Sequence, residues 1–195
     1  MDQQINKIDN EQPDKLIIES DWSMNSLKIL MPYSYVSNLV NLNWYDILFA
    51  VRNGFLPYQS AVEHAIVEVE NNKEYPQAVF DLACLFLNEA DEYVVTPLLK
   101  ELTKQIPDDI KYDTKDKILY VLLNWVFEHR QSYKDPLEAV EFVYDDFNFP
   151  DSIKHFIRYQ PSDEPSSGSL EANIERIYNK WKIFLDEQKL KYSNN

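Results

Sequence analysis

The stretch NWYDILFAVRNG, residues 43–54, decides the fold that this sequence predicts. Residues 44–53 form a short, mostly apolar helix, with Asn43 placed to cap its first turn and Gly54 placed just after its last. Only Asp46 and Arg52 are strongly polar inside it, so we expect the helix to be buried on most sides. The stretch therefore predicts a central packing element.

Helix-start signals recur along the rest of the chain. Proline at the first helical position, and Ser, Thr, Asn or Asp at the cap, are the usual signals. They predict further helices that begin at Pro57, near residue 76, at Thr96-Pro97, after Thr114, at Asp135-Pro136, near residue 151 and after Ser169. The third helix, 76–88, carries the apolar residues Val79, Phe80, Ala83, Phe86 and Leu87. The last helix should dock one face through Leu170, Ile174, Ile177, Trp181 and Phe184.

These helices define the expected fold class. Successive helices could pair as antiparallel hairpins that recur about 30 to 40 residues apart. We therefore expect an all-α protein built as an irregular stack of antiparallel helical hairpins. Two short apolar runs, 16–18 and 27–31, are too brief to distinguish strand from helix, so a short extended segment near the N-terminus stays open.

The expected domain organisation is simple. A chain of 195 residues suits a single domain. Residues 1–14 are polar and acidic and are predicted to form a flexible tail, while 15–195 are predicted to form one helical domain. Residues 161–168 concentrate proline, serine, aspartate and glycine, which is typical of a loop.

Composition excludes several classes of function. The net charge of −14 repels the phosphate backbone, so we expect no nucleic-acid binding and a basic partner instead. Phosphate-cradling loops and nucleophile elbows require glycines in a pattern that Gly54 and Gly168 cannot supply. A single cysteine, no signal-peptide pattern and no apolar run of membrane-spanning length predict a cytoplasmic protein without a membrane segment.

No residue pattern requires a particular catalytic chemistry. His64, His129 and His155 are scattered, and although Glu68 lies one turn after His64, such helix pairs are usually only electrostatic. Cys84 follows Phe80 by one turn on an apolar face and is expected to be a small buried hydrophobe. We therefore predict no enzyme, no catalytic or metal-binding residue and no cofactor.

One helix carries a candidate partner-binding face. In the helix that starts at Asp135-Pro136, one face is apolar and the opposite face is acidic. Phe142 projects from the acidic face, as an aromatic contact rimmed by charge would for a basic partner. The predicted site consists of Glu138, Glu141, Phe142, Asp145 and Asp146. The alternative is that Phe142 packs under a neighbouring helix, which is the usual fate of a phenylalanine.

A stretch of about thirty residues resembles a known bacterial family. Residues 43–47, 53–56 and 60–65, which read NWYDI, NGFL and SAVEHA, look like the opening of the family called domain of unknown function 2247. These are packing motifs, so the resemblance implies a small bacterial cytoplasmic protein and transfers no active-site residue. The acidic residues 1–14 depart from the family pattern.

Three functions are compatible with these features. The first is a protein that binds and neutralises or chaperones a basic partner, such as an immunity or antitoxin protein. The second is an enzyme whose site is assembled from distant helices, which would show as a pocket with strongly shifted titrating groups. The third is a helical scaffold that presents a groove to a peptide. We expect the first.

Overall fold

The computed structural model describes residues 24–161 and 168–192, and within these ranges it contains helices and no strand. The predicted all-α class is therefore confirmed. The predicted acidic tail, the run 16–18 and most of the predicted loop at 161–168 lie outside the described residues. The elements are α2 (Tyr33–Leu39), α3 (Trp44–Arg52), α4 (Gln59–Asn71), α5 (Gln77–Ala83), α6 (Glu92–Thr103), α7 (Asp108–Glu128), η1 (Arg130–Ser132), α8 (Pro136–Asp146), η2 (Lys154–Phe156) and α9 (Leu170–Tyr192).

Helix α3 forms as its sequence predicts. The Asn43 side chain accepts hydrogen bonds from the backbone N–H groups of Tyr45 and Asp46, and the Asp46 carboxylate accepts one from the Asn43 N–H. This reciprocal capping box satisfies donors that the first turn cannot pair internally. Gly54 ends the helix with φ of +72°, a conformation that costs other residues a clash at Cβ.

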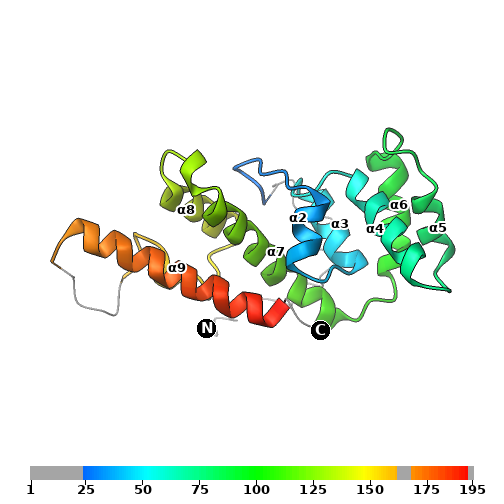
Figure 1. Cartoon of the computed structure of the whole chain (residues 1–195). Helices are drawn as coiled ribbons and strands as arrows, with labels where there is room; N and C mark the ends of the chain where they lie inside the picture. The colour runs from blue at the N-terminus through cyan, green and yellow to red at the C-terminus, as the bar shows by residue number, and fades with distance from the viewer. Residues whose placement is uncertain (1–23, 162–167, 193–195) are drawn as a thin grey trace, which may run out of the picture.

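Helix α3 lies between two groups of helices. Helices α4, α5 and α6 pack in succession at one end of the molecule, whereas α7 contacts α8 and α9 at the other (Figure 1). Helix α3 contacts both α6 and α7 and so joins the two ends. Every residue of α3 from Trp44 to Val51 is buried, which confirms the predicted central helix. Nearly all the buried apolar residues of α2 to α9 form one cluster.

Two helices begin earlier than predicted. Helix α6 starts at Glu92 because Asp91 caps it, which leaves Pro97 inside the helix instead of at its first position. Helix α7 starts at Asp108, directly after Pro107, so Thr114 lies in its second turn and caps nothing. The Thr114 hydroxyl is buried and donates to Asp46 instead. The Thr114 side chain therefore makes a tertiary contact in place of the helix cap that the local pattern predicted.

Three further helix predictions were wrong in part. Helix α5 ends at Ala83, so Phe86 and Leu87 are exposed at 72% and 52% instead of packing on an apolar stripe. The segment near residue 151 contains only the short η2. Helix α9 starts after Ser169, whose hydroxyl accepts from Ala172 N–H as predicted, but Leu170 is 71% exposed. The docked face of α9 is formed further along the helix, where Trp181 and Phe184 are buried.

The run at 27–31 adopts neither of the two structures that its sequence left open. It is an irregular segment that the Asn25 side chain holds, because its amide donates to the carbonyls of Ile29 and Gly54. Met31 N–H also donates to the Phe55 carbonyl. These bonds fix the segment against the turn between α3 and α4.

Candidate functional site

Helix α8 presents the predicted acidic face to solvent. Asp135 caps the helix by accepting from Leu137 and Glu138 N–H groups, and Pro136 occupies the first position. The opposite face is buried against the core. Phe142 is 44% exposed, so a large part of this residue reaches water in the free protein. We call Asp135, Glu138, Glu141, Phe142, Asp145 and Asp146 the α8 face.

Most of the carboxylates on the α8 face are held by neighbouring groups. Arg158 donates two hydrogen bonds to Glu141, at 2.8 and 2.9 Å, and a third to Asp135 at 2.6 Å. Burial alone would raise the pKa of Asp135, but the Arg158 guanidinium and the capping bonds outweigh it, and the pKa lies below its usual value. The arginine therefore fixes the geometry of this end of the face.

The other end of the α8 face is bonded to two different segments. Tyr159 OH donates to Asp145 at 3.0 Å, and burial together with this carboxylate raises the pKa of Tyr159 to about 12. Ser26 donates to Asp146 from both its N–H, at 2.9 Å, and its hydroxyl, at 2.8 Å. The five predicted residues thus lie together on α8, in an ordered setting that sequence reasoning did not foresee.

An exposed aromatic side chain follows the end of α8. Asn148 and Phe149 both have positive φ, at +60° and +56°, a conformation that is strained for a residue as bulky as phenylalanine. The Phe149 N–H donates to the Tyr144 carbonyl, and its ring packs edge-on against Tyr144 at 5.3 Å. Phe149 is nevertheless 56% exposed. Phe149 therefore combines a strained backbone conformation with an aromatic ring that is exposed to solvent.

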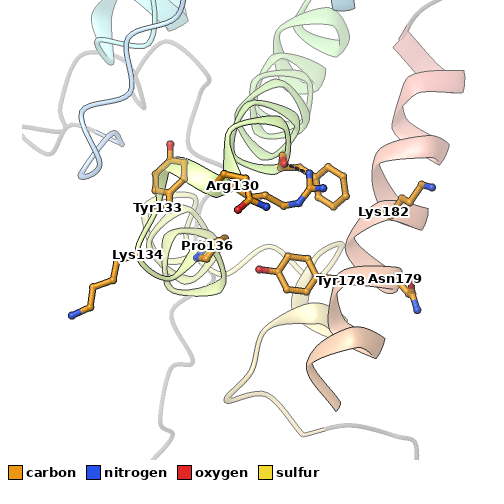
Figure 2. Close-up of a pocket in the computed structure, with 9 residues that line it drawn as sticks. Arg130, Tyr133, Lys134, Pro136, Tyr178, Asn179 and Lys182 are labelled. Carbon is orange, nitrogen blue, oxygen red and sulfur yellow. Dashed lines mark hydrogen bonds between the residues drawn. The ribbon is translucent and has the colours of Figure 1, made fainter. Parts of the chain in front are cut away.

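A pocket of about 580 Å³ opens between the end of α7, the start of α8 and the middle of α9 (Figure 2). Its volume falls within the range of small-molecule sites. Three of its lining side chains are cationic and none is a carboxylate, in a chain whose acidic residues far outnumber its basic ones. The lining residues are Phe127, Arg130, Gln131, Tyr133, Lys134, Pro136, Tyr178, Asn179 and Lys182.

Arg130 is the best-ordered cation of the pocket. Its Nη1 donates to the Phe127 carbonyl at 2.7 Å, and its guanidinium lies 4.7 Å from the centre of the Phe127 ring. Figure 2 shows it between α7 and α9, with the Tyr178 ring reaching from α9 toward Pro136. Burial raises the pKa values of both Tyr133 and Tyr178, so both phenols keep their protons at neutral pH.

Sequence reasoning missed this pocket. Its residues come from 127–136 and 178–182, and no local pattern joins two segments that far apart. A signal was present in part, because Arg130 and Lys182 are basic residues without an acid at the next residue, in a chain with a net charge of −14, whereas Lys134 is directly followed by Asp135. A second signal was Tyr133 and Tyr178 beside those cations.

A buried ion pair lies outside both surfaces. Lys117 Nζ is 2.6 Å from Asp46 Oδ2 and 3.2 Å from the Asn41 carbonyl oxygen, and Thr114 donates to Asp46 Oδ1 at 2.5 Å. The Asp46 side chain is fully buried and that of Lys117 is 11% exposed. With every Asp46 oxygen bonded, this network joins α3 to α7 and is structural in character.

His64 and Cys84 occupy contrasting settings. Burial lowers the pKa of His64 to about 4, and its Nδ1 pairs with Tyr33 OH at 2.9 Å while its ring packs edge-on against Trp44. Cys84, in contrast, is exposed at the end of α5, so the expectation that it is a buried hydrophobe was wrong. Cys84 is the C-cap residue of α5, and Phe80, one turn before it, is itself 45% exposed, so the side of α5 that carries both residues is not covered.

The fold and these surfaces define a class of protein: an acidic all-α protein with one charged aromatic face and one cationic pocket. Among the described residues, no helix is both long and apolar enough to cross a membrane. A family described as uncharacterized protein conserved in bacteria, DUF2247, matches residues 33–189. The chain belongs to this family, and the resemblance seen at 43–65 extends over most of its length. Searches of curated proteins and of solved structures give no match.

Proposed function

We propose that this protein is a non-catalytic cytoplasmic protein that binds a basic protein partner through the α8 face, in the manner of an immunity or antitoxin protein. The observation that carries the proposal is the exposure of Phe142 among the carboxylate side chains of α8. The immunity role is the particular form that fits a small acidic protein whose charge speeds and orients the encounter.

The α8 face has the composition of a binding surface. Fully burying an exposed phenylalanine contributes about 1.5–3 kcal/mol, and Phe142, at 44% exposed, would contribute about half of that. Aromatic residues are enriched among the residues that carry most binding energy at protein interfaces. Around Phe142 the face carries five carboxylates from Asp135 to Asp146, and Arg158 pairs with two of them, Glu141 and Asp135. Its remaining charge is negative, which complements a basic partner and repels an acidic one.

Binding is favoured over catalysis by the chemistry of the pocket and of the α8 face. The residues that line the pocket include no histidine, cysteine or carboxylate, and its two tyrosines stay protonated at neutral pH. General acid–base catalysis is most efficient with a group whose pKa lies near the operating pH, and a nucleophile is usually activated by an adjacent base. On the α8 face, Arg158 and Tyr159 hold Glu141 and Asp145 in hydrogen bonds that favour a fixed surface.

The test compares matched variants on affinity columns. Wild-type protein, Phe142→Ala and Glu138→Lys are immobilised beside two controls, Phe86→Ala and Glu101→Lys, which change an exposed phenylalanine and an exposed glutamate far from α8 along the chain. A lysate of the native host is passed over each column at low and then moderate salt. We expect one basic protein to be retained in equimolar amount by the wild type and both controls, and to be released as salt screens the charges.

The two α8 variants decide the outcome. We expect Phe142→Ala and Glu138→Lys to lose the partner while keeping the circular dichroism spectrum and melting temperature of the wild type within about 3 °C. Equal retention by all five proteins would show that the α8 face is not the site. Retention of nothing by the wild type at either salt would refute the proposal of a basic partner.

A further inference from the structure

The loop that joins α5 to α6, residues 84–91, presents apolar side chains to water. Phe86 and Leu87 are neighbours in this loop and are both largely exposed, and Tyr93, at the start of α6, is exposed at 87%. Single apolar residues on a surface need no explanation, but neighbouring ones mark interaction sites. The 84–91 loop is therefore a candidate contact surface.

Hydrogen bonds hold the 84–91 loop in one conformation. The Phe86 N–H donates to the Glu89 carboxylate at 3.0 Å, and the Glu89 N–H donates to the Phe86 carbonyl at 2.9 Å. From α4, the Gln59 amide donates to the carbonyls of Leu87, at 3.0 Å, and Ala90, at 3.3 Å. A loop that is ordered before binding loses less conformational entropy when its partner arrives.

The surroundings of the 84–91 loop are acidic. The chain has no lysine or arginine between Lys73 and Lys100. The exposed carboxylates near the loop form no ion pair with any described residue, and they are Asp81, Glu89, Asp91 and Glu92. A surface that combines apolar side chains with unpaired acids is complemented by an apolar hollow with a positive rim.

The pocket between α7, α8 and α9 has this complementary character. Its charged lining residues are all cations, and among the described residues none of them pairs with a carboxylate. Figure 2 shows Lys134 and Lys182 on opposite sides of the pocket, with their side chains directed away from its centre. Cations placed in this way do not converge on one small anion. They are placed to meet acids on both sides of an inserted protein loop.

The interior of the pocket suits apolar side chains. Its volume of about 580 Å³ falls within the range of sites that take up groups larger than one side chain. The Tyr178 ring and Pro136 form part of its wall, and Tyr178 stacks with Trp181, which supports the ring (Figure 2). The side-chain amides of Gln131 and Asn179 also line the pocket and can bond to the backbone of an inserted loop.

The 84–91 loop and the pocket lie at opposite ends of the molecule. Helices α4, α5 and α6 form one end, and α8 and α9 lie at the other, with α2 and α3 between them (Figure 1). The loop therefore cannot enter the pocket of its own chain. Only a second copy of the protein can bring these two surfaces together.

We propose that this protein self-associates, with the 84–91 loop of one copy inserted in the pocket between α7, α8 and α9 of another. Phe86 and Leu87 enter the pocket, and the acids beside the loop face Lys134 and Lys182 at its rim. The contact is heterologous, because it joins two different surfaces of the same chain. It uses none of the residues of the α8 face, so it stands independently of the proposed basic partner.

Sedimentation velocity on the full chain tests for self-association. The salt is set at about 0.15 M, where the Debye length of about 8 Å screens the net charge of −14 more than it screens charges in contact. We expect the sedimentation coefficient to rise between about 5 and 500 μM, the range expected of a small transient interface. A monomer throughout this range would overturn the proposal.

Mixing two variants tests whether the loop meets the pocket. The loop variant Phe86→Ala/Leu87→Ala keeps an intact pocket, and the pocket variant Lys134→Glu/Lys182→Glu keeps an intact loop; both change only exposed side chains. Each alone should associate roughly tenfold or more weakly than the wild type. An equimolar mixture should form a heterodimer, because the loop of one variant fits the pocket of the other. A mixture that stays monomeric while the wild type associates would overturn the loop-in-pocket contact.

Two controls accompany these variants. Lys100→Glu/Lys104→Glu makes the same change of net charge with two exposed lysines at the end of α6, and it should associate as the wild type does. Loss of association in this control would attribute the effect of the pocket variant to net charge alone. Phe142→Ala should also associate normally, even when it loses the basic partner, so the two proposals fail separately.

Photocrosslinking from Cys84 locates the contact. Cys84 is the one cysteine of the chain, and it is exposed at the start of the loop, so a maleimide-benzophenone attached to it reports what the loop touches. The acceptor is ¹⁵N-labelled Cys84→Ser, which carries no thiol, so every crosslink to it is intermolecular. Mass spectrometry should place the crosslinks in 127–136 or 178–182. Crosslinks to 84–94 of the acceptor would show that two loops pair with each other and would overturn the proposal.

Discussion

Asp46 on α3 and Lys117 on α7 form a buried ion pair, 2.6 Å between Oδ2 and Nζ, across 71 residues of sequence. The same Asp46 carboxylate also completes the capping box of its own helix and accepts from Thr114. The Asp46 side chain thus caps the first turn of α3 and also fixes α3 against α7.

Removing one partner of this pair should destabilise the fold strongly. Lys117→Met leaves the Asp46 charge buried without its counter-charge, which typically costs about 3–5 kcal/mol. Urea denaturation followed by circular dichroism measures the loss, and Lys100→Met, on an exposed position of α6, should change stability by less than about 0.5 kcal/mol. A loss below about 1 kcal/mol for Lys117→Met would contradict the structural role given to the pair.

Gly54 should be required for its backbone conformation and not for space. Gly54→Ala should cost about 1–2 kcal/mol because φ is +72°, although a Cβ there would meet only Asn25 Nδ2 at an ordinary 3.8 Å. Gly54→Asn, a residue that tolerates positive φ, should recover part of the loss. Thermal melts of both variants check this, and an alanine variant as stable as the wild type would exclude backbone strain as the cause.

The pH dependence of stability should carry the signature of His64. Its folded-state pKa of about 4 lies below the 6.5 of the unfolded chain, so its contribution is complete above pH 6.5 and is lost as pH falls toward 4. Between pH 7.5 and 5.0 the wild type should lose about 2 kcal/mol more than His64→Phe, which cannot be protonated. Urea midpoints at the two pH values measure the difference, and parallel losses would show that His64 titrates normally in the folded protein.

Cys84 should react as an exposed thiol. Because it is exposed at the end of α5, the folded protein should release one equivalent of thionitrobenzoate on treatment with Ellman's reagent, without denaturant. Cys84→Ser should abolish the reaction and leave the melting temperature unchanged. A thiol that reacts only in urea would instead indicate that α5 continues past Ala83 and buries it.

Local signals predicted the helices that local contacts determine. Asn43, Gly54 and the pair Asp135-Pro136 act on backbone groups within four residues, and each marks the boundary that its pattern predicted. Thr96 and Thr114 misled the prediction because Asp91 and Pro107 begin those helices earlier. The Thr114 hydroxyl serves a contact 68 residues away, which no local pattern reveals.

The surfaces were predictable to different degrees. The α8 face follows from helical periodicity, since Glu138, Glu141, Phe142 and Asp145 share one side of a single helix. Its bonds to Ser26, Arg158 and Tyr159 depend on tertiary packing and could not be predicted. The pocket needed the same information, because Arg130 and Tyr178 meet only when α9 returns along α7.

Helix α3 is buried at every residue from Trp44 to Val51, and it contacts both α6 and α7. Neither end of the molecule can therefore open fully without exposing it, so the two ends should melt as one cooperative unit. Its amide protons should exchange with deuterium only through global unfolding, and they should be the slowest in the chain. The amide protons of α3 would then report the stability of the whole protein.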